Sequence, residues 1–496
     1  MKLIGKKILT TITTIFIVLF IWIVINAIFL GQEVIFKYNS ALLILSIIIY
    51  ISLTVILYKK IIPILAKYKY LHLALFTIFG LIAIVVSYKI RVNPSWDMGR
   101  IFNIAQTYVK EGYVSDVYLY EYQNNIAITC IYILFFEFFK IMNITKEVVA
   151  ITIMNALIVT CAVIFLYYAV REMFNKEKAM MVLIICIFTT PFYLYSAIYY
   201  SDSLSMFFST LLLLLYVLIR KQNNKTINIL LQILWGISIV VGIKVKIASF
   251  FIIIAIVLWE LLNGNFKELF NNFKVTLPIA LIFYLIYTLV VNTYVIPKKD
   301  TLNYCKMPIE HWILLGLDGP GGFNQELYEY TKGYKTYEER KNADIIKIKE
   351  KIKEYNIISF IAHINEKLKF TWADGTYFAS DKISREPVSR NTLTEIFANN
   401  GKYANFYKYF PQTMHLGMLV FMVVNVVFIL KKQNYNIDDV FLFISIFGLA
   451  VFFMIWENRS RYILTLVPIM IVLEVNGIEQ LSNKIKNVFK SNKESY

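Results

Sequence analysis

The chain has 496 residues, of which 58% are hydrophobic and only 17% are charged, and its formal net charge is +17. Long apolar runs with few internal charges recur along it, a pattern typical of an integral membrane protein and not of a soluble one. Most of the positive charges lie in short loops between these runs. They therefore indicate the orientation of the chain in a membrane, and they argue against a nucleic-acid partner.

The apolar runs predict an all-α polytopic membrane protein with about twelve transmembrane helices, in a range of eleven to thirteen. The first run is too long for a signal peptide, so it is predicted to be an uncleaved span. Because basic loops face the cytoplasm, both chain ends are expected inside; Lys244 and Lys246 are the exception to this charge pattern. The predicted spans are residues 8–30, 41–58, 70–89, 148–170, 179–199, 204–219, 227–243, 247–262, 275–296, 412–430, 438–456 and 462–481.

The predicted spans divide the chain into five parts. The one large polar part is an external, α-rich region whose basic and acidic residues are similar in number. Its aromatic-rich pieces, His311-Trp312 and Phe370 to Tyr377, are expected to return to the mouth of the membrane bundle. The parts are residues 1–90 with spans one to three, 91–146 with a first external loop and interfacial helices, 147–296 with spans four to nine, 297–410 as the external region, and 411–496 with three spans and a cytoplasmic tail.

The apolar run 126–139 decides the topology. If it crossed the membrane, every later basic loop would lie outside, which the charge rule opposes. The run is also short for a span and is interrupted by Glu137. It is therefore predicted to lie in the outer interface.

Asp97 follows the third apolar run, at the external mouth of the predicted bundle. Ser95 can serve as the N-cap of a helix from Trp96 to about Gly112, with Asp97 in its first turn. Asp97 then shares a helix face with apolar residues, so its carboxylate is directed toward the membrane. The structural alternative is that Asp97 only complements the helix dipole, a gain of about 0.3 to 1 kcal/mol.

Several charged and polar residues share the external rim with Asp97. Such charges cost up to about 2.5 to 3.5 kcal/mol each in a membrane unless they are paired or hydrated. One interpretation pairs the acids with Arg459 or Arg461 as structural ion pairs. The other notes that cations exceed acids, which leaves positive charge for an anion such as a lipid phosphate. The rim residues are Asp97, Asp202, Lys244, Lys246, His311, Glu457, Arg459, Arg461 and Tyr462.

Four short segments, in this order and on one side of the membrane, resemble the GT-C membrane glycosyltransferases, a class that includes protein O-mannosyltransferases and the lipid A aminoarabinose transferase. The resemblance runs from about residue 70 to 481. The chain departs from this class in two ways. Three apolar runs precede Asp97, whereas members of the class usually have one span before the catalytic loop. Asp202 also has no second acid two residues away. The segments are Trp96-Asp97-Met98-Gly99-Arg100, Tyr200-Ser201-Asp202, Lys246 and Arg459-Ser460-Arg461-Tyr462.

The resemblance implies a transferase of the bacterial plasma membrane with its site on the extracytoplasmic face. It implies that Asp97 is the general base of an inverting single displacement and that Asp202 supports it. The sugar donor would be an undecaprenyl-phosphate-type lipid, and the acceptor an envelope glycopolymer, a lipid or a protein. The expected contacts to the lipid phosphate or substrate are Lys246, Arg461 and Tyr462, followed by Arg459, Lys244, His311 and Arg100.

No cofactor is expected. The isolated Asp202 argues against a metal pair, and no two histidines or cysteines are spaced as ligands of a metal site, so no metal is expected to be obligatory.

Two other functions fit a multi-span chain with one external region. A polysaccharide polymerase or ligase would place its arginines mainly in the large external region and not around two early acids. A flippase or transporter of lipid-linked sugars would show repeat symmetry and helices broken near the midplane. The sequence shows neither clearly, with Pro191 the one candidate break.

Overall fold

The computed structural model describes residues 3–30, 36–114, 116–297, 299–433 and 435–494. These residues form helices and loops, with one isolated β-bridge between Val92 and Pro387. Among them, eleven helices are long and apolar enough to cross a membrane, or twelve if the bent pair α9 (Lys176–Phe188) and α10 (Thr190–Ser196) forms one span. The prediction of an all-α polytopic membrane protein with about twelve spans is confirmed.

Three long apolar helices precede the first external loop, as predicted. Each carries large apolar side chains on its outer surface, as expected for helices that face lipid. Packing against later helices fixes them, because α1 and α2 contact α23 while α4 contacts α8. Their bounds are α1 (Leu3–Ile25) with the π-helical turn Asn26–Leu30, α2 (Ser40–Ile56) with the π-helical turn Leu57–Ile61, α3 (Ile62–Leu65) and α4 (Leu71–Lys89).

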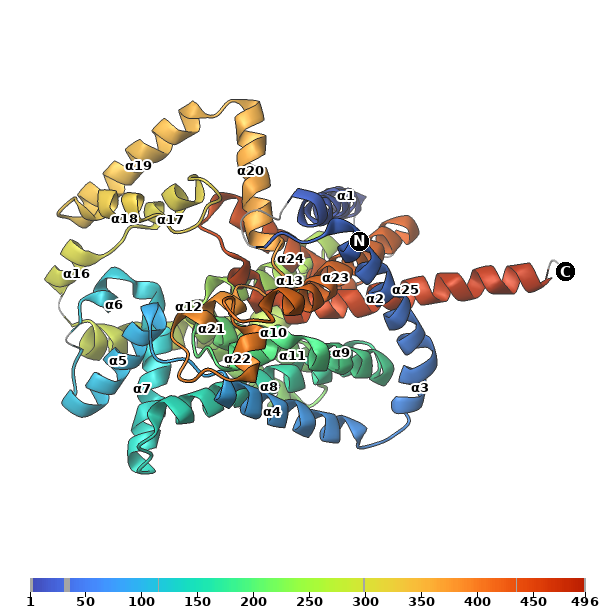
Figure 1. The fold of residues 1–496 in the computed structure, drawn as a ribbon, viewed down its shortest axis with the longest axis horizontal. Coiled ribbons are helices and arrows are strands. Elements are labelled where there is room, and N and C mark those ends of the chain that lie inside the picture. Colours follow the sequence, from blue (N-terminus) through green and yellow to red (C-terminus); the bar gives the residue numbers. More distant parts are fainter. Residues whose placement is uncertain (1–2, 31–35, 115, 298, 434, 495–496) are drawn as a thin grey trace.

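The first external loop contains α5 (Trp96–Glu111), α6 (Tyr118–Glu121) and α7 (Ile126–Ile141), and α5 packs against α7. By length and composition Gln123–Ile141 could span a membrane. Figure 1 shows α7 running across the direction of α4 and α8, at the end of the bundle where α5 and α6 lie. This crosswise direction is what an interfacial helix requires, and the interfacial placement stays a prediction.

The central helix of the bundle is α11, which contacts α8, α12 and the 3-10 helix η6. Pro191 lies at the break between α9 and α10, which are bent by 62°. The predicted eighth span corresponds to Ile247–Asn263, a shorter apolar helix. The bounds are α8 (Glu147–Met173), α11 (Ser201–Lys221), α12 (Lys225–Val245), α13 (Phe250–Asn263), α14 (Phe266–Phe273) and α15 (Thr276–Val290) with the π-helical turn Val291–Val295.

The external region has two parts. Helices α17, α18 and α19 enclose a small core of their own, made of Leu314, Leu315 and Leu327. Helices α20 to α22 return to the bundle, which α23, α24 and α25 complete. The bounds are α16 (Lys299–Cys305), α17 (Ile309–Gly316), α18 (Gln325–Lys332), α19 (Tyr337–Glu354), α20 (Ile357–Trp372), α21 (Ala379–Arg385), α22 (Thr392–Phe397), α23 (Ala404–Lys432), α24 (Ile437–Ile455), η6 (Ser460–Leu466) and α25 (Val467–Glu494).

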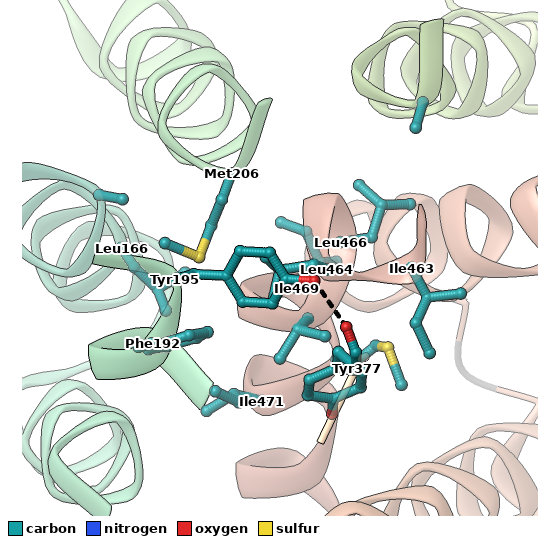
Figure 2. Close-up of a cluster of buried hydrophobic side chains, with 14 of the residues drawn as sticks. Leu166, Phe192, Tyr195, Met206, Tyr377, Ile463, Leu464, Leu466, Ile469 and Ile471 are labelled. Atoms are coloured by element: carbon teal, nitrogen blue, oxygen red, sulfur yellow. Dashed lines mark hydrogen bonds between the residues drawn. The ribbon is translucent and has the colours of Figure 1, made fainter. Parts of the chain in front are cut away.

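The loop between α20 and α21 enters the bundle. Figure 2 shows Tyr195 of α10 pointing at Tyr377 of this loop, to whose carbonyl oxygen its hydroxyl donates a hydrogen bond of 2.6 Å. The loop also meets α23, because the Gly375 N–H donates to Gln412 Oε1 at 2.7 Å. A Cβ on Gly375 would lie 2.6 Å from the Gln412 Cα, so this close approach requires glycine. The expected return of the segment Phe370 to Tyr377 to the bundle is thus observed.

Candidate active site

The backbone before α5 is held by the external region. The Asn93 N–H donates to the Glu386 carbonyl at 2.8 Å, and the Val388 N–H donates to the Arg91 carbonyl at 3.0 Å. Trp96, the first residue of α5, has φ +45°, a region that costs a non-glycine residue about 1 to 3 kcal/mol. A strained backbone conformation persists only where neighbouring contacts hold it. The hydrogen bonds with Glu386 and Val388 therefore fix the backbone conformation at the start of α5.

The sequence Trp96-Asp97-Met98-Gly99 folds into the predicted first turn. Ser95 occupies the N-cap position with extended φ and ψ, but its side chain makes no capping hydrogen bond. A Cβ on Gly99 would meet the Pro94 carbonyl carbon at 2.7 Å, so the turn can pack onto Pro94 only with glycine at this position. Asp97 therefore projects from a turn whose position is set by packing and not by a side-chain cap.

Asp97 is half-buried and has a neutral partner. The Tyr118 hydroxyl donates to Asp97 Oδ1 at 2.9 Å, and Asn125 Nδ2 donates to the same hydroxyl at 2.7 Å. The Tyr200 hydroxyl in turn donates to Asn125 Oδ1 at 3.2 Å. In the part of the chain that the structure describes, Asp97 makes no ion pair. Hydrogen bonds through Tyr118, Asn125 and Tyr200 thus connect the Asp97 carboxylate to the residue before α11.

Asp202, in contrast, is buried and holds two cations. Its Oδ1 forms an ion pair with Lys246 Nζ, and its Oδ2 lies 3.3 Å from Arg461 Nη1. Both cations are largely buried too, so the single carboxylate of Asp202 offsets only one of the two buried positive charges. The structure therefore realises the structural ion pair that the sequence left as one interpretation, and it assigns that pair to Asp202 and not to Asp97.

Tyr462 joins the remaining rim acid to this cluster. Its hydroxyl donates to Glu457 Oε1 at 2.9 Å, and Lys246 Nζ lies 4.8 Å from the centre of its ring. Arg461 Cζ lies 4.8 Å from the same ring and 5.4 Å from the ring of Tyr200. Burial raises the pKa of Glu457. Glu457 therefore offsets less positive charge than an exposed carboxylate would.

Lys382, which the sequence did not single out, also belongs to the site. It is 5% exposed, and its Nζ lies 3.2 Å from the centre of the Trp96 ring. Burial and the guanidinium groups of Arg461 and Arg385 lower the pKa of Lys382 to about 6, while Asp202 and Asp97 raise it. Among the described residues it has ring contacts but no acid within ion-pair distance. Lys382 is thus a buried amine close to both acids and bound by neither.

Three of the predicted site residues form no ion pair with the acids among the described residues. Lys244 Nζ lies over the rings of Tyr284 and Tyr287 of α15, at 4.8 and 5.6 Å. His311 is buried within the external region, where its Nδ1 lies 2.8 Å from Thr331 Oγ1, and burial lowers its pKa to about 4. Arg459 is 3.8 Å from the centre of the Phe378 ring. Cation–π contacts account for the positions of Lys244 and Arg459. Burial within the external region accounts for the position of His311.

A cavity of about 580 Å³ opens beside Asp97. Its walls come from α5, α6 and the external helix α18, which Figure 1 shows together at one end of the molecule. Arg100, the last predicted site residue, lies in this wall and pairs with Asp116 at 3.0 Å. In the described chain, no group of three His, Cys, Asp or Glu side chains could hold a metal ion.

The fold and the site define an integral membrane protein with a cluster of acids and cations where the loops that carry α5, α6 and α21 meet the helical bundle. The chain belongs to the family described as conserved hypothetical integral membrane protein, whose model matches residues 2–481. None of the curated proteins matches it.

Among solved structures, a crystal structure of ArnT from Cupriavidus metallidurans bound to undecaprenyl phosphate is similar to the chain. The identity is 10% and the TM-score 0.37, over 83% of this chain and 78% of that chain. Because this TM-score is low, the roles proposed below rest on the contacts of this chain alone.

Proposed function

We propose that the protein is a membrane glycosyltransferase that moves a sugar from a polyprenyl-phosphate donor to an acceptor on the extracytoplasmic side. The observation that carries the proposal is the difference between its two acids. Asp202 is buried and bound by Lys246 and Arg461, whereas among the described residues Asp97 has the neutral Tyr118 as its one side-chain partner and lines an open cavity. An acid in the position of Asp97 is available to take a proton from a bound molecule.

The buried basic side chains around Trp96 and Tyr200 suit a phosphate group. Lys382 has no acid partner among the described residues, and Lys246 and Arg461 share the single carboxylate of Asp202. A sugar phosphodiester carries one negative charge, and the polyprenyl phosphate that it releases carries up to two. Preorganised cations of this kind stabilise the charge that develops on the leaving group, usually the largest contribution in such sites.

The proposed reaction is one displacement. Asp97 accepts the proton of an acceptor hydroxyl while that oxygen forms a bond to the anomeric carbon of the sugar. The bond from the anomeric carbon to the phosphate oxygen breaks, and its electron pair leaves with the polyprenyl phosphate. Attack opposite to the leaving group inverts the anomeric configuration. Tyr118 orients the Asp97 carboxylate through its hydrogen bond, and Asp202 orients the two cations that it binds.

The test is sugar transfer by the purified protein from a polyprenyl-phosphate donor, normalised to folded protein. Asp97→Asn keeps the shape of the side chain but cannot accept the proton, so transfer is expected to fall by about a hundred- to ten-thousandfold. Asp97→Glu moves the carboxylate by one methylene and is expected to lose about a hundredfold. The matched control is Glu350→Gln, which also converts an acid to its amide but lies on α19, half-exposed and outside the lining of the cavity. Transfer by Asp97→Asn at the wild-type rate would contradict the proposal.

The same assay separates the proposal from a flippase. A transferase releases polyprenyl phosphate in proportion to the sugar that it transfers. Movement of intact donor across vesicles without such release would favour the transport function instead.

A further inference from the structure

The cavity beside Asp97 lies between two parts of the chain that are far apart in sequence. One wall is the first external loop, with Asp97, Tyr118 and Tyr122, and the other is α18 of the external region, with Tyr328 and Lys332. The Tyr328 hydroxyl donates to Glu121 Oε1 at 2.6 Å and so closes the junction between the walls. A molecule in the cavity would touch Asp97 and the external region at once.

The charges in these walls already have partners. Arg100 pairs with Asp116 at 3.0 Å, and Lys332 lies 3.9 Å from Glu121 Oε2. Lys332 Nζ also donates to the Tyr328 hydroxyl at 2.9 Å. With Asp97 included, the lining has three carboxylates against two cations. An anion would therefore meet net repulsion, while a neutral polar molecule finds donors and acceptors that are held in place.

The tyrosines supply flat surfaces beside these polar groups. The rings of Tyr118 and Tyr122 lie 5.1 Å apart, and Tyr122 lies 6.1 Å from Trp312 of the external region. A tyrosine presents an apolar ring face together with a hydroxyl, which matches the alternating C–H and O–H surfaces of a sugar ring. The volume of about 580 Å³ is in the usual range for a small-molecule site.

We propose that this cavity binds the acceptor, and that the acceptor is the end of a neutral carbohydrate chain whose hydroxyl reaches Asp97. The proposal rests on the proposed function, since it takes Asp97 to be the base for that hydroxyl. Lipid acyl chains fit poorly, because Pro94 and Val117 are the only aliphatic residues in the described lining. The phosphate of the donor belongs with the cations around Lys382 and not in this cavity.

A binding measurement tests the proposal independently of catalysis. The probes are neutral hexasaccharides of glucose, mannose and N-acetylglucosamine, with a hexamer of galacturonate as the anionic probe, titrated into the full-length protein in detergent. At least one neutral hexamer is expected to bind the wild-type protein. The galacturonate hexamer is expected to bind at least tenfold more weakly.

Variants of the cavity wall should weaken binding of the neutral probe. Tyr122→Ala removes a ring surface and is expected to cost about tenfold, and Tyr328→Phe removes one hydroxyl and is expected to cost about fivefold. Tyr334→Phe, in the turn after α18, is the matched control. In the transfer assay Tyr122→Ala should raise the KM for the acceptor while the KM for the donor stays unchanged.

The two proposals fail in different ways. If no neutral hexamer binds, or if the wall variants bind it as the wild type does, the acceptor lies elsewhere, even if Asp97→Asn abolishes transfer. Preferential binding of galacturonate would also overturn the neutral acceptor. If the wall variants lose binding but Asp97→Asn transfers sugar normally, the carbohydrate site stands and the catalytic function fails.

Discussion

Asp202 binds Arg461 at 3.3 Å although 259 residues separate them in the chain, and the same carboxylate binds Lys246. Asp202→Asn would leave two buried cations without their acid. Removing one partner of a buried ion pair typically costs about 3 to 5 kcal/mol, so this variant is expected to unfold at a clearly lower temperature than the wild type. Thermal unfolding in detergent is the measurement.

Asp97→Asn is the control for this experiment. It exchanges one hydrogen-bond acceptor for another and removes no ion pair, so its unfolding free energy is expected to stay within about 1 kcal/mol of the wild type. Equal stability of the two variants would show that Asp202 does not organise the cations.

Gly375 offers a test of the loop that enters the bundle. A Cβ there would clash with backbone atoms of Pro411 and Gln412 of α23, which cannot move without shifting the helix. Gly375→Ala is therefore expected to lower the unfolding free energy by about 1 to 3 kcal/mol and to reduce sugar transfer, because the loop leads into Lys382. Gly333→Ala, which meets neighbouring atoms only at ordinary contact distance, is the control. Wild-type stability of Gly375→Ala would mean that the loop adapts.

Local patterns in the sequence predicted the helix that carries Asp97 almost to the residue. The predicted helix ran from Trp96 to about Gly112, and α5 runs from Trp96 to Glu111 with Gly112 in the left-handed conformation as its C-cap. Helix starts and glycine ends are set by neighbouring residues, so they can be predicted. The count of spans was predictable for the same reason, since length and hydropathy are local properties.

The partners within the site could not be predicted. The sequence placed Asp97, Asp202 and the cations on one side of the membrane, but the choice of acid for Lys246 and Arg461 depends on packing across hundreds of residues. Lys382 gave no signal at all, because it lies in an ordinary polar stretch and becomes a site residue only when the loop before α21 enters the bundle and brings this helix to Trp96. The position of His311 was equally hidden, because its contacts with Thr331 and Trp312 form only when α17 and α18 pack together.

Topology can be tested with cysteines on either side of α7. Tyr113 precedes α7 and Met142 follows it, and both are more than half exposed. If α7 lies in the interface, both positions are outside, so single cysteines at both should react with a membrane-impermeant reagent in intact cells, while one at Lys176 should not. The native cysteines to be replaced first are Cys130, Cys161, Cys186 and Cys305. Labelling of only one of the two flanking positions would mean that α7 spans the membrane.

Lys382 should make donor binding depend on pH. Its pKa of about 6 means that the amine is mostly neutral in the empty site at pH 7 and becomes mostly charged as the pH falls below about 6. A bound phosphodiester favours the ammonium form and raises this pKa, so binding above pH 6 takes up a proton. Affinity for the donor should therefore fall as pH rises from 6, by at most about tenfold per pH unit.

Lys382→Arg separates this effect from other titrations. The side chains whose charges act on Lys382 are Arg461, Arg385, Asp202 and Asp97, and all four remain in the variant. Arginine keeps its charge at every pH in this range, so the variant should still bind the donor but without the proton uptake. Calorimetric titration of a short-chain polyprenyl-phosphate sugar, in buffers of different ionisation enthalpy, counts the protons directly. The same uptake in wild type and Lys382→Arg would place the titrating group elsewhere and remove Lys382 from the phosphate site.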